Sequence, residues 1–391
     1  MRRITVTGSA LALTLAATAC QDVTTAPSSF APTTTAADRQ VSAGALASVR
    51  LERGRLAFPS MARIADGPSA DLTRRVINPD DYVCQETTPL IDWYTREVRR
   101  FITKEPALFD LLYNQLLADL IPTYQAAYFE TNRTPQYFGY DGEFNNVLNR
   151  TERDVKRFWD IDARRIQLVA MHGTVLQNVR KTAMTYEFLF GLDSATSYEI
   201  AGIVKDAVKQ SRVLHGGDHP LFTFNSFAIS SDDGSIPEKI VMGDGVLEGY
   251  DAIGYGDVAP QAVYAHEFAH HIQFDNGYFN DPYALMGSGA EQTRYTELMA
   301  DAYAGYYLTH KKGAAMNRRR VQEFLHVFFD IGDCAFDDDG HHGTPNQRMK
   351  AAKFGFDVAE SAKQKGKVLS SAEFHALFVK EYPKLIAPDA N

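Results

Sequence analysis

The stretch AHEFAHHIQFDN, residues 265–276, carries two histidines and a glutamate in the pattern His266-Glu267-x-x-His270. On a helix, side chains at i and i+4 project from the same face, so the two imidazoles lie close enough to share one metal ion. Glu267 is offset by about 100° around the axis. Its carboxylate therefore lies beside the metal, where it can take the proton of a zinc-bound water. The alternative is an ordinary amphipathic helix that happens to carry histidines.

A catalytic zinc needs a third protein ligand and an open position for water. Glu297 and Asp301 lie at i and i+4 in the downstream segment TELMADAYAG, whose alanines keep part of a predicted helix slim. Glu297 could complete a His-His-Glu site, and Asp301 could accept the second N–H of a ligand imidazole. Such an acidic pair alone would indicate a solvated helix face. Together with the upstream histidine motif, it favours a metal site instead.

Three segments, AHEFAHHIQ, TELMADAYAG and HHGTPNQRMKAAKFGF, are similar in their order and in their residues to motifs of the bacterial putative neutral zinc metallopeptidase family. The pattern Glu-x-x-Ala-Asp following His-Glu-x-x-His also resembles the motif order of the gluzincins, a broader group of zinc peptidases. The resemblance covers roughly residues 222–356 and does not obviously extend to the N-terminal half. It implies a zinc-dependent peptidase with one Zn²⁺ per chain, held by His266, His270 and Glu297, with Glu267 as the catalytic base.

Upstream of the motif, FNSFAIS resembles the edge strand on which thermolysin-like enzymes bind a substrate backbone, with Ser226 in place of an alanine. The comparison makes Asn225 and Phe227 candidate substrate-binding residues. An edge strand can pair with an extended peptide through main-chain hydrogen bonds. A plain core hairpin is an equally good interpretation of the same residues.

The segment FDDDGHHGTPNQR offers His341 and His342 after an acidic run. Peptide hydrolysis needs a donor aimed at the developing oxyanion. His342 occupies the position of the family's single histidine before Gly-Thr, which favours it over His341 as a catalytic residue, with one of Asp337 to Asp339 as its partner. The alternatives are a solvated acidic loop and a calcium site built from the aspartates.

The elements that must position these residues are mostly helices. Pro260 suits the first turn of the motif helix and Gly277 suits its end. Apolar residues at helical spacing predict further helices in segments 88–102, 106–124, 197–211, 295–312, 318–333, 346–361 and 371–382. Period-two alternation predicts strands in 165–173, 220–230 and 239–249, and breaking residues predict a loop over 131–149. The fold class is α+β, and the resemblance makes it zincin-like: a small sheet with its edge strand packed on the active-site helix, between largely helical N- and C-terminal parts.

The composition is that of a folded protein, with 45% apolar and 12% aromatic residues in a chain of 391. Its formal charge of −9, from 49 acidic against 40 basic residues, argues against nucleic acid as a partner. The same charge argues against binding to an anionic membrane surface.

The first 20 residues resemble a bacterial lipoprotein signal: Arg2 and Arg3 precede an apolar stretch that ends at Cys20, the predicted lipidation site. The stretch is too short for a spanning helix, so a lipid anchor would be the only membrane contact. This predicts an exported protein of the cell envelope, on the outer membrane if the cell has one. Cleavage without lipidation, giving a periplasmic or secreted protein, is the alternative. Residues 21–78 are interpreted as a flexible tether and transition.

Only Cys84 and Cys334 remain after the predicted signal. In an exported protein such a pair favours one disulfide. Two unpaired buried thiols are the alternative.

Residues 79–385 are predicted to form the metallopeptidase domain, with a helical N-terminal half, 79–220, and a zinc-site half, 221–385. The predicted activity is hydrolysis of a peptide or protein substrate. Endopeptidase is favoured, because no Gly-x-Met-Glu-Asn motif for gripping a free amino terminus precedes the helix. Two alternatives stay open: a surface lipoprotein that binds a partner or glycan with a non-catalytic zincin-like fold, and a zinc hydrolase acting on a non-peptide bond.

Overall fold

A computed structural model of the chain describes residues 84, 87–231, 234, 236–334, 341–365 and 367–388. The predicted signal with its lipidation site Cys20, the tether over 21–78 and the acidic run Asp337 to Asp339 lie outside these residues. The described part is mostly helical with one small sheet, which agrees with an α+β class.

The sheet has three strands, β1 (Gln167–Met171), β2 (Ser226–Ile229) and β3 (Lys239–Gly243), in the order β1-β3-β2. β1 pairs with β3 in parallel, while β2 pairs with β3 antiparallel. The sheet is therefore mixed, and β2 is an edge strand. The strand predicted over 239–249 is wrong beyond Gly243, because α9 (Asp244–Ala252) starts there with an acidic residue in its first turn, where the helix dipole favours negative charge.

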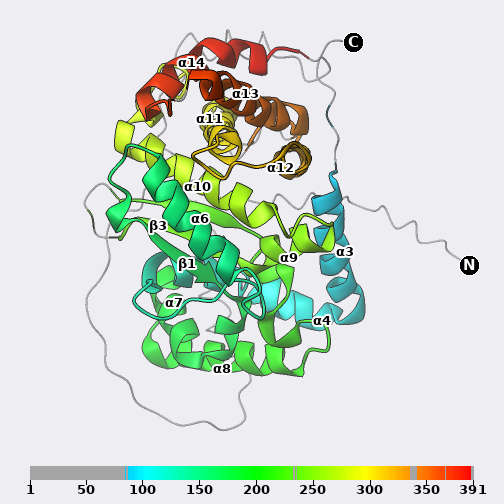
Figure 1. The fold of residues 1–391 in the computed structure, drawn as a ribbon. Coiled ribbons are helices and arrows are strands. Elements are labelled where there is room, and N and C mark those ends of the chain that lie inside the picture. The colour runs from blue at the N-terminus through cyan, green and yellow to red at the C-terminus, as the bar shows by residue number, and fades with distance from the viewer. Residues whose placement is uncertain are drawn as a thin grey trace, which may run out of the picture.

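The N-terminal helices lie on both sides of the sheet (Figure 1). Helices α7 (Val179–Phe190) and α8 (Ser194–Gln210) pack together below it in this view, while α6 (Asn145–Phe158) lies above it against the motif helix. α6 begins inside the segment 131–149, so the prediction of a loop is wrong for its last residues.

The leucine-rich segment 106–124 is not the single helix that its spacing predicts. After α3 (Pro89–Lys104) the chain forms the short α4 (Pro106–Phe109), a π-helical turn, and α5 (Leu120–Tyr124). The break comes at Leu117, whose φ of 52° is left-handed and incompatible with a continuing helix. The leucines still share one cluster with Phe101, because Leu112, Leu116 and Leu117 are all buried in it.

The motif helix α10 (Ala259–Asn276) lies between the sheet and the C-terminal helices (Figure 1). It contacts β2 and β3 on one side and α11 (Gly289–Thr309) on the other. The remaining helices are α12 (Arg318–Asp330), α13 (Pro345–Lys365) and α14 (Ser371–Leu385). α10 begins and ends as predicted, with Pro260 in its first turn and Gly277 as a left-handed cap at φ 69°.

Helix α11 is the centre of the C-terminal part, and it packs very closely against α13. A Cβ added at Gly305 would lie 2.2 Å from the carbonyl oxygen of Ala352, and one added at Gly355 would lie 2.1 Å from that of Ala302. Both distances are too short for a real side chain, so glycine is required at this crossing. The contact fixes α13 against the face of α11 that carries Asp301.

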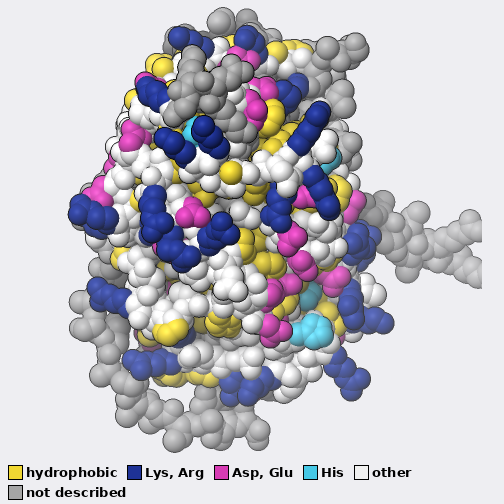
Figure 2. Space-filling model, in the orientation of Figure 1, with side chains coloured by type: hydrophobic (Ala, Val, Ile, Leu, Met, Phe, Trp, Pro, Cys, Tyr) yellow, Lys and Arg dark blue, Asp and Glu magenta, His cyan; other side chains and the backbone are white. Residues whose placement is uncertain are grey.

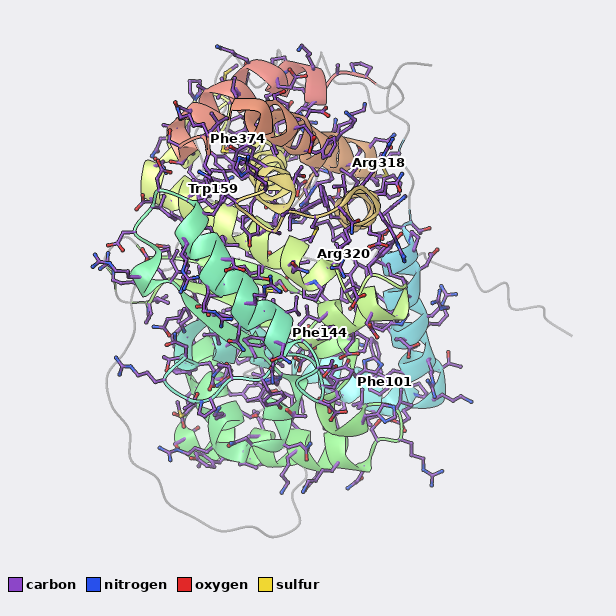
Figure 3. The ribbon with its side chains drawn as sticks, in the orientation of Figure 1. Phe101, Phe144, Trp159, Arg318, Arg320 and Phe374 are labelled. Atoms are coloured by element: carbon purple, nitrogen blue, oxygen red, sulfur yellow. A yellow bond between two sulfur atoms is a disulfide. The ribbon has the colours of Figure 1, made fainter. Side chains whose placement is uncertain are left out.

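The main hydrophobic cluster joins both ends of the described chain, from Leu90 to Leu385. Trp159, which follows α6, and Phe374, on α14, lie near each other in Figure 3, with ring centroids 6.1 Å apart. On the face shown in Figure 2, Lys and Arg side chains are interspersed with Asp and Glu. None of the described helices combines the length and the apolar composition that crossing a membrane requires.

A disulfide joins Cys84 to Cys334 across a sequence separation of 250 residues, as the sequence favoured. Close to it, the Thr88 hydroxyl donates a hydrogen bond of 2.6 Å to the carbonyl oxygen of Asp330 at the end of α12. The start of α3 is therefore attached to the end of α12 twice, once by a covalent bond and once by a buried hydrogen bond.

We predict that removing the disulfide destabilises the fold. Replacing both cysteines, Cys84→Ser with Cys334→Ser, lets the unfolded chain expand, so the free energy of unfolding should fall by about 2–5 kcal/mol. Urea denaturation followed by circular dichroism measures the change. As a control, a reducing agent should destabilise the wild type and leave the double-serine protein unaffected. Equal unfolding midpoints for the oxidised wild type and the variant would contradict the prediction.

Candidate metal centre

The helix that carries the histidine motif is buried on every side. All its residues from Ala262 to Gln273 are buried, including His266, Glu267 and His270. A helix with apolar surroundings all round lies inside a protein rather than at its surface. The alternative of an ordinary amphipathic helix is therefore wrong, and the two histidines need buried partners.

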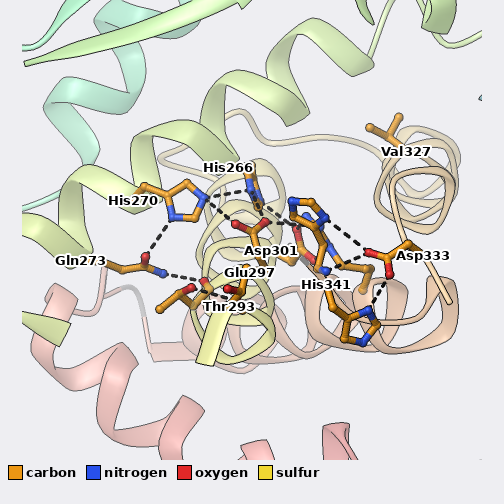
Figure 4. Close-up of polar contacts among 12 residues, drawn as sticks. His266, His270, Gln273, Thr293, Glu297, Asp301, Val327, Asp333 and His341 are labelled. Carbon is orange, nitrogen blue, oxygen red and sulfur yellow. Dashed lines mark hydrogen bonds and ion pairs between the residues drawn. The ribbon is translucent and has the colours of Figure 1, made fainter. Parts of the chain in front are cut away.

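Those partners come from α11, which brings Glu297 against the two histidines (Figure 4). His266 Nε2 lies 3.1 Å from His270 Nε2 and 3.2 Å from Glu297 Oε2. His270 Nε2 lies 3.4 Å from Glu297 Oε1. Two ligand atoms held about 2.0–2.1 Å from one zinc ion at the tetrahedral angle are about 3.3–3.4 Å apart. Each of the three separations is close to this value, with the two histidines facing different oxygens of Glu297, and one ligand atom from each residue lies within 4.8 Å of the others.

Two buried carboxylate oxygens beside this triad support the fit. Glu267 Oε2 and Glu297 Oε1 accept no hydrogen bond from any described residue. A buried acceptor without a partner is costly. A cation at the triad with water next to it would satisfy both oxygens, so the residues present fit a metal ion.

Glu267 is buried beside the triad on α10. Burial raises the pKa of its carboxyl group to about 7, although the positive charge of His266 opposes the shift. The backbone of Ala228, in the edge strand β2, also opposes this rise in pKa. Helix α10, which carries Glu267, contacts the strand that the sequence connected with substrate binding.

The two histidines differ in their outer hydrogen bonds. His266 Nδ1 lies 2.9 Å from Asp301 Oδ1, as the sequence suggested. Burial lowers the pKa of His266, but hydrogen bonds to Asp301 and Glu297 outweigh it and raise the pKa to about 10. Burial lowers the pKa of His270 to about 4. The metal-free site thus holds a proton on His266, which a bound metal ion must displace.

His270 has a partner that the sequence analysis missed. Its Nδ1 lies 2.9 Å from Oε1 of Gln273, whose amide nitrogen donates a 2.7 Å hydrogen bond to the carbonyl oxygen of Thr296 on α11. This hydrogen bond fixes the orientation of the His270 ring, so that its Nε2 faces the other two candidate ligands, His266 and Glu297. The signal was available, because Gln273 follows His270 by three residues on the same helix.

A second missed residue is Arg348, in the first turn of α13. Its guanidinium group binds Asp301 through two hydrogen bonds, of 2.5 Å to Oδ2 and 2.8 Å to Oδ1. It also lies 3.3 Å from Glu297 Oε2. Burial alone raises the pKa of Glu297, but the neighbouring His270, His266 and His342 lower it well below its usual value.

The histidine pair after the acidic run is held by Asp333, which precedes that run. His341 Nδ1 lies 2.6 Å from Asp333 Oδ1, and the backbone N–H of His342 donates a 2.8 Å hydrogen bond to Oδ2. His342 Nδ1 lies 3.4 Å from the same oxygen. The sequence proposed a partner among Asp337 to Asp339, whose placement is not described, and it missed Asp333.

The two candidate substrate-binding residues lie at the edge strand. Asn225 immediately precedes β2, and Phe227 is buried in a cluster with Val241, its register partner on β3. The side chain of Phe227 therefore serves the core, and only the backbone of the strand is left for contact with a substrate.

Several other histidines have structural partners. His271 Nε2 is 2.9 Å from the carbonyl oxygen of Lys239, which ties α10 to β3. His172 Nδ1 lies 2.6 Å from Asp244 Oδ2. A cavity of about 340 Å³ is lined by His172, Glu130 and Lys181 among others, and none of the three candidate ligands borders it.

We predict that the purified protein binds one zinc ion and that binding depends on the triad. Glu297→Ala removes a ligand and should reduce the amount of bound zinc per chain to near zero. Atomic spectroscopy after dialysis measures this amount. His271→Gln is the matched control, because this neighbour is equally buried on α10 but lies outside the triad, and it should keep its zinc. Full zinc content in Glu297→Ala would contradict the ligand assignment.

No protein-family model matches the chain, and neither a curated protein nor a solved structure matches it. The gluzincin resemblance therefore gains no support from these comparisons. What the structure shows is a buried His266/His270/Glu297 triad, able to hold a metal ion, in a mostly helical α+β protein.

Proposed function

We propose that this protein is a zinc-dependent hydrolase that cleaves peptide bonds within a protein or peptide chain. One observation carries the proposal: two imidazole nitrogens and the Glu297 carboxylate, close enough to share one metal ion, lie beside a buried carboxylate, Glu267, that has an oxygen without a hydrogen-bond partner. A purely structural metal site has no need of such a base.

The donor set favours zinc. Two imidazoles and one carboxylate are the ligands of catalytic zinc sites, which leave a fourth position open. Zinc held by His266, His270 and Glu297 would supply Lewis acidity and lower the pKa of a coordinated water. Asp301 and Gln273 fix the tautomers of the two imidazoles through their Nδ1 atoms.

Glu267 is the proposed general base. It follows His266 on α10 without taking part in the triad. Glu267 accepts the proton of the attacking water and later returns it to the leaving amine. Burial of the carboxylate excludes competing water from this transfer.

His342 is the proposed donor to the oxyanion that forms on the substrate carbonyl. Its backbone N–H and its ring are both held by Asp333. His342 retains more exposure, at 12% of its side-chain surface, than His341 at 1%. Its electrostatic influence on Glu297 supports a position near the triad.

The edge strand β2 is the proposed substrate-binding element, and its place supports a zincin-like arrangement. It is antiparallel to β3 and contacts α10, the helix that carries Glu267. An extended peptide pairing with its backbone next to Asn225 would pass beside the triad. Such pairing does not need a chain terminus, which favours an endopeptidase.

The disulfide favours an oxidising compartment outside the cytoplasm. It supports the proposal that the chain is exported. The lipid anchor at Cys20 and the peptidase domain over 79–385 rest on the sequence alone. Hydrolysis of an ester or amide in the cell envelope is the second candidate, because the same water, base and metal would serve it.

We predict that Glu267→Gln abolishes hydrolysis and leaves zinc binding intact. The amide keeps the shape of the side chain but cannot accept the proton, so kcat/KM should fall about 10²–10⁴-fold. Cleavage of casein and of a quenched peptide library measures the activity. Wild type and Glu267→Gln behaving alike on every substrate would refute the peptidase. Cleavage of envelope esters or amides alone would support the second candidate.

We predict that His342→Ala lowers kcat by about 10²–10³-fold with little change in KM, because the donor acts on charge that develops in the transition state. Steady-state kinetics with one quenched peptide separates the two constants. His341→Ala is the matched comparison and should have the smaller effect on kcat. The reverse order would assign the donor to His341.

A further inference from the structure

We propose that Arg348 is a positioning residue of the metal centre, which holds Asp301 and Glu297 together so that His266 and Glu297 present their donor atoms to one ion. The inference rests on the proposed function, since it assumes that the triad binds zinc. It gives a role to Gln347 and Arg348 at the start of α13, which take no direct part in the proposed reaction.

The geometry is that of a planar fork on a carboxylate. The Nε and Nη2 atoms of Arg348 bind the two oxygens of Asp301 at 2.5 and 2.8 Å, and Nη1 lies 3.3 Å from Glu297 Oε2. Only a guanidinium group has three donors arranged to do this. One side chain therefore sets the distance between the carboxylate that ligates and the carboxylate that orients His266.

The three charged groups are fully enclosed, with exposures of 1% for Arg348, 0% for Asp301 and 1% for Glu297. Buried charges are tolerated when they are paired and hydrogen-bonded. Arg348 compensates one of the two negative charges, and the second remains for a cation at the triad. Without Arg348, only His266 would link the two carboxylates.

Arg348 is itself held firmly. Thr344 and Gln347 bind each other reciprocally at the start of α13, with the Thr344 N–H donating to Gln347 Oε1 at 3.1 Å and the Gln347 N–H donating to Thr344 Oγ1 at 3.2 Å. The glycine crossing at Gly305 and Gly355 fixes the same helix against α11. The fork thus belongs to a rigid element.

The charge and the geometry of Arg348 have opposite effects on metal binding, which makes the inference testable. A positive charge this close repels Zn²⁺, so if charge were its only contribution, removing it would tighten zinc binding. If Arg348 positions the ligands, removing it weakens binding, because partners of this kind contribute about 10–100-fold to metal affinity.

The experiment measures zinc affinity by competition with a chromophoric chelator, for the full mature chain and for Arg348→Met and Arg348→Lys. We expect both variants to bind zinc about 10–100-fold more weakly, since lysine restores the charge without the fork. The absorption spectrum of the Co²⁺-substituted protein should also change. Unchanged or tighter zinc binding in Arg348→Met, or full rescue by lysine, would overturn the proposal.

Arg294→Lys is the matched control. This arginine is also buried, at 2%, and lies on α11 one turn before Glu297, but its charge acts on Tyr382 of α14. Its replacement should leave zinc affinity unchanged. Circular dichroism of each variant establishes folding, and the lysine variant carries the test if Arg348→Met does not fold. A wild type without zinc would refute the proposed function, whereas a wild type with zinc and equally tight Arg348 variants would refute only this inference.

Discussion

Compensation of buried charge is the constraint on which this structure depends. Glu267, Glu297, Asp301 and Arg348 are all enclosed between α10, α11 and α13, together with two imidazoles. Ionised groups in such a place are stable only when they neutralise and hydrogen-bond one another. In the metal-free chain, Arg348 and a proton on His266 offset two of the three carboxylates, and burial raises the pKa of the third, Glu267, to about 7. The site is arranged so that a divalent cation can take the place of the proton.

The surrounding helices follow from this constraint. Charges from three helices meet only if the helix axes come close, which explains the small residues along α11 and the glycine crossing with α13. Close approach makes the interior dense, and a dense interior holds donor atoms at fixed separations.

The sequence predicted those features that depend on local spacing and missed those that depend on tertiary contacts. The i, i+4 pairs of α10 and α11, the caps at Pro260 and Gly277, and the edge strand could all be read from short windows. Arg348 and Asp333 could not, because nothing in a neighbouring window shows which carboxylate or histidine they face. The break at Leu117 was also missed, since its leucines are buried in one cluster whether or not the helix is continuous. The short α9 was missed because Val246 and Leu247 are buried residues that suit a strand equally well.

The Cys84–Cys334 bridge turns most of the chain into a covalent ring that contains α3 to α12, with both histidines and Glu297 inside it. A single cut anywhere within that ring leaves the two pieces joined. For a protein that we propose to hydrolyse peptide bonds, and that would work among other such enzymes outside the cell, this has a protective value. One nick in an exposed loop would cost one peptide bond without releasing a fragment, and the ligands on either side of the cut would stay in the same molecule.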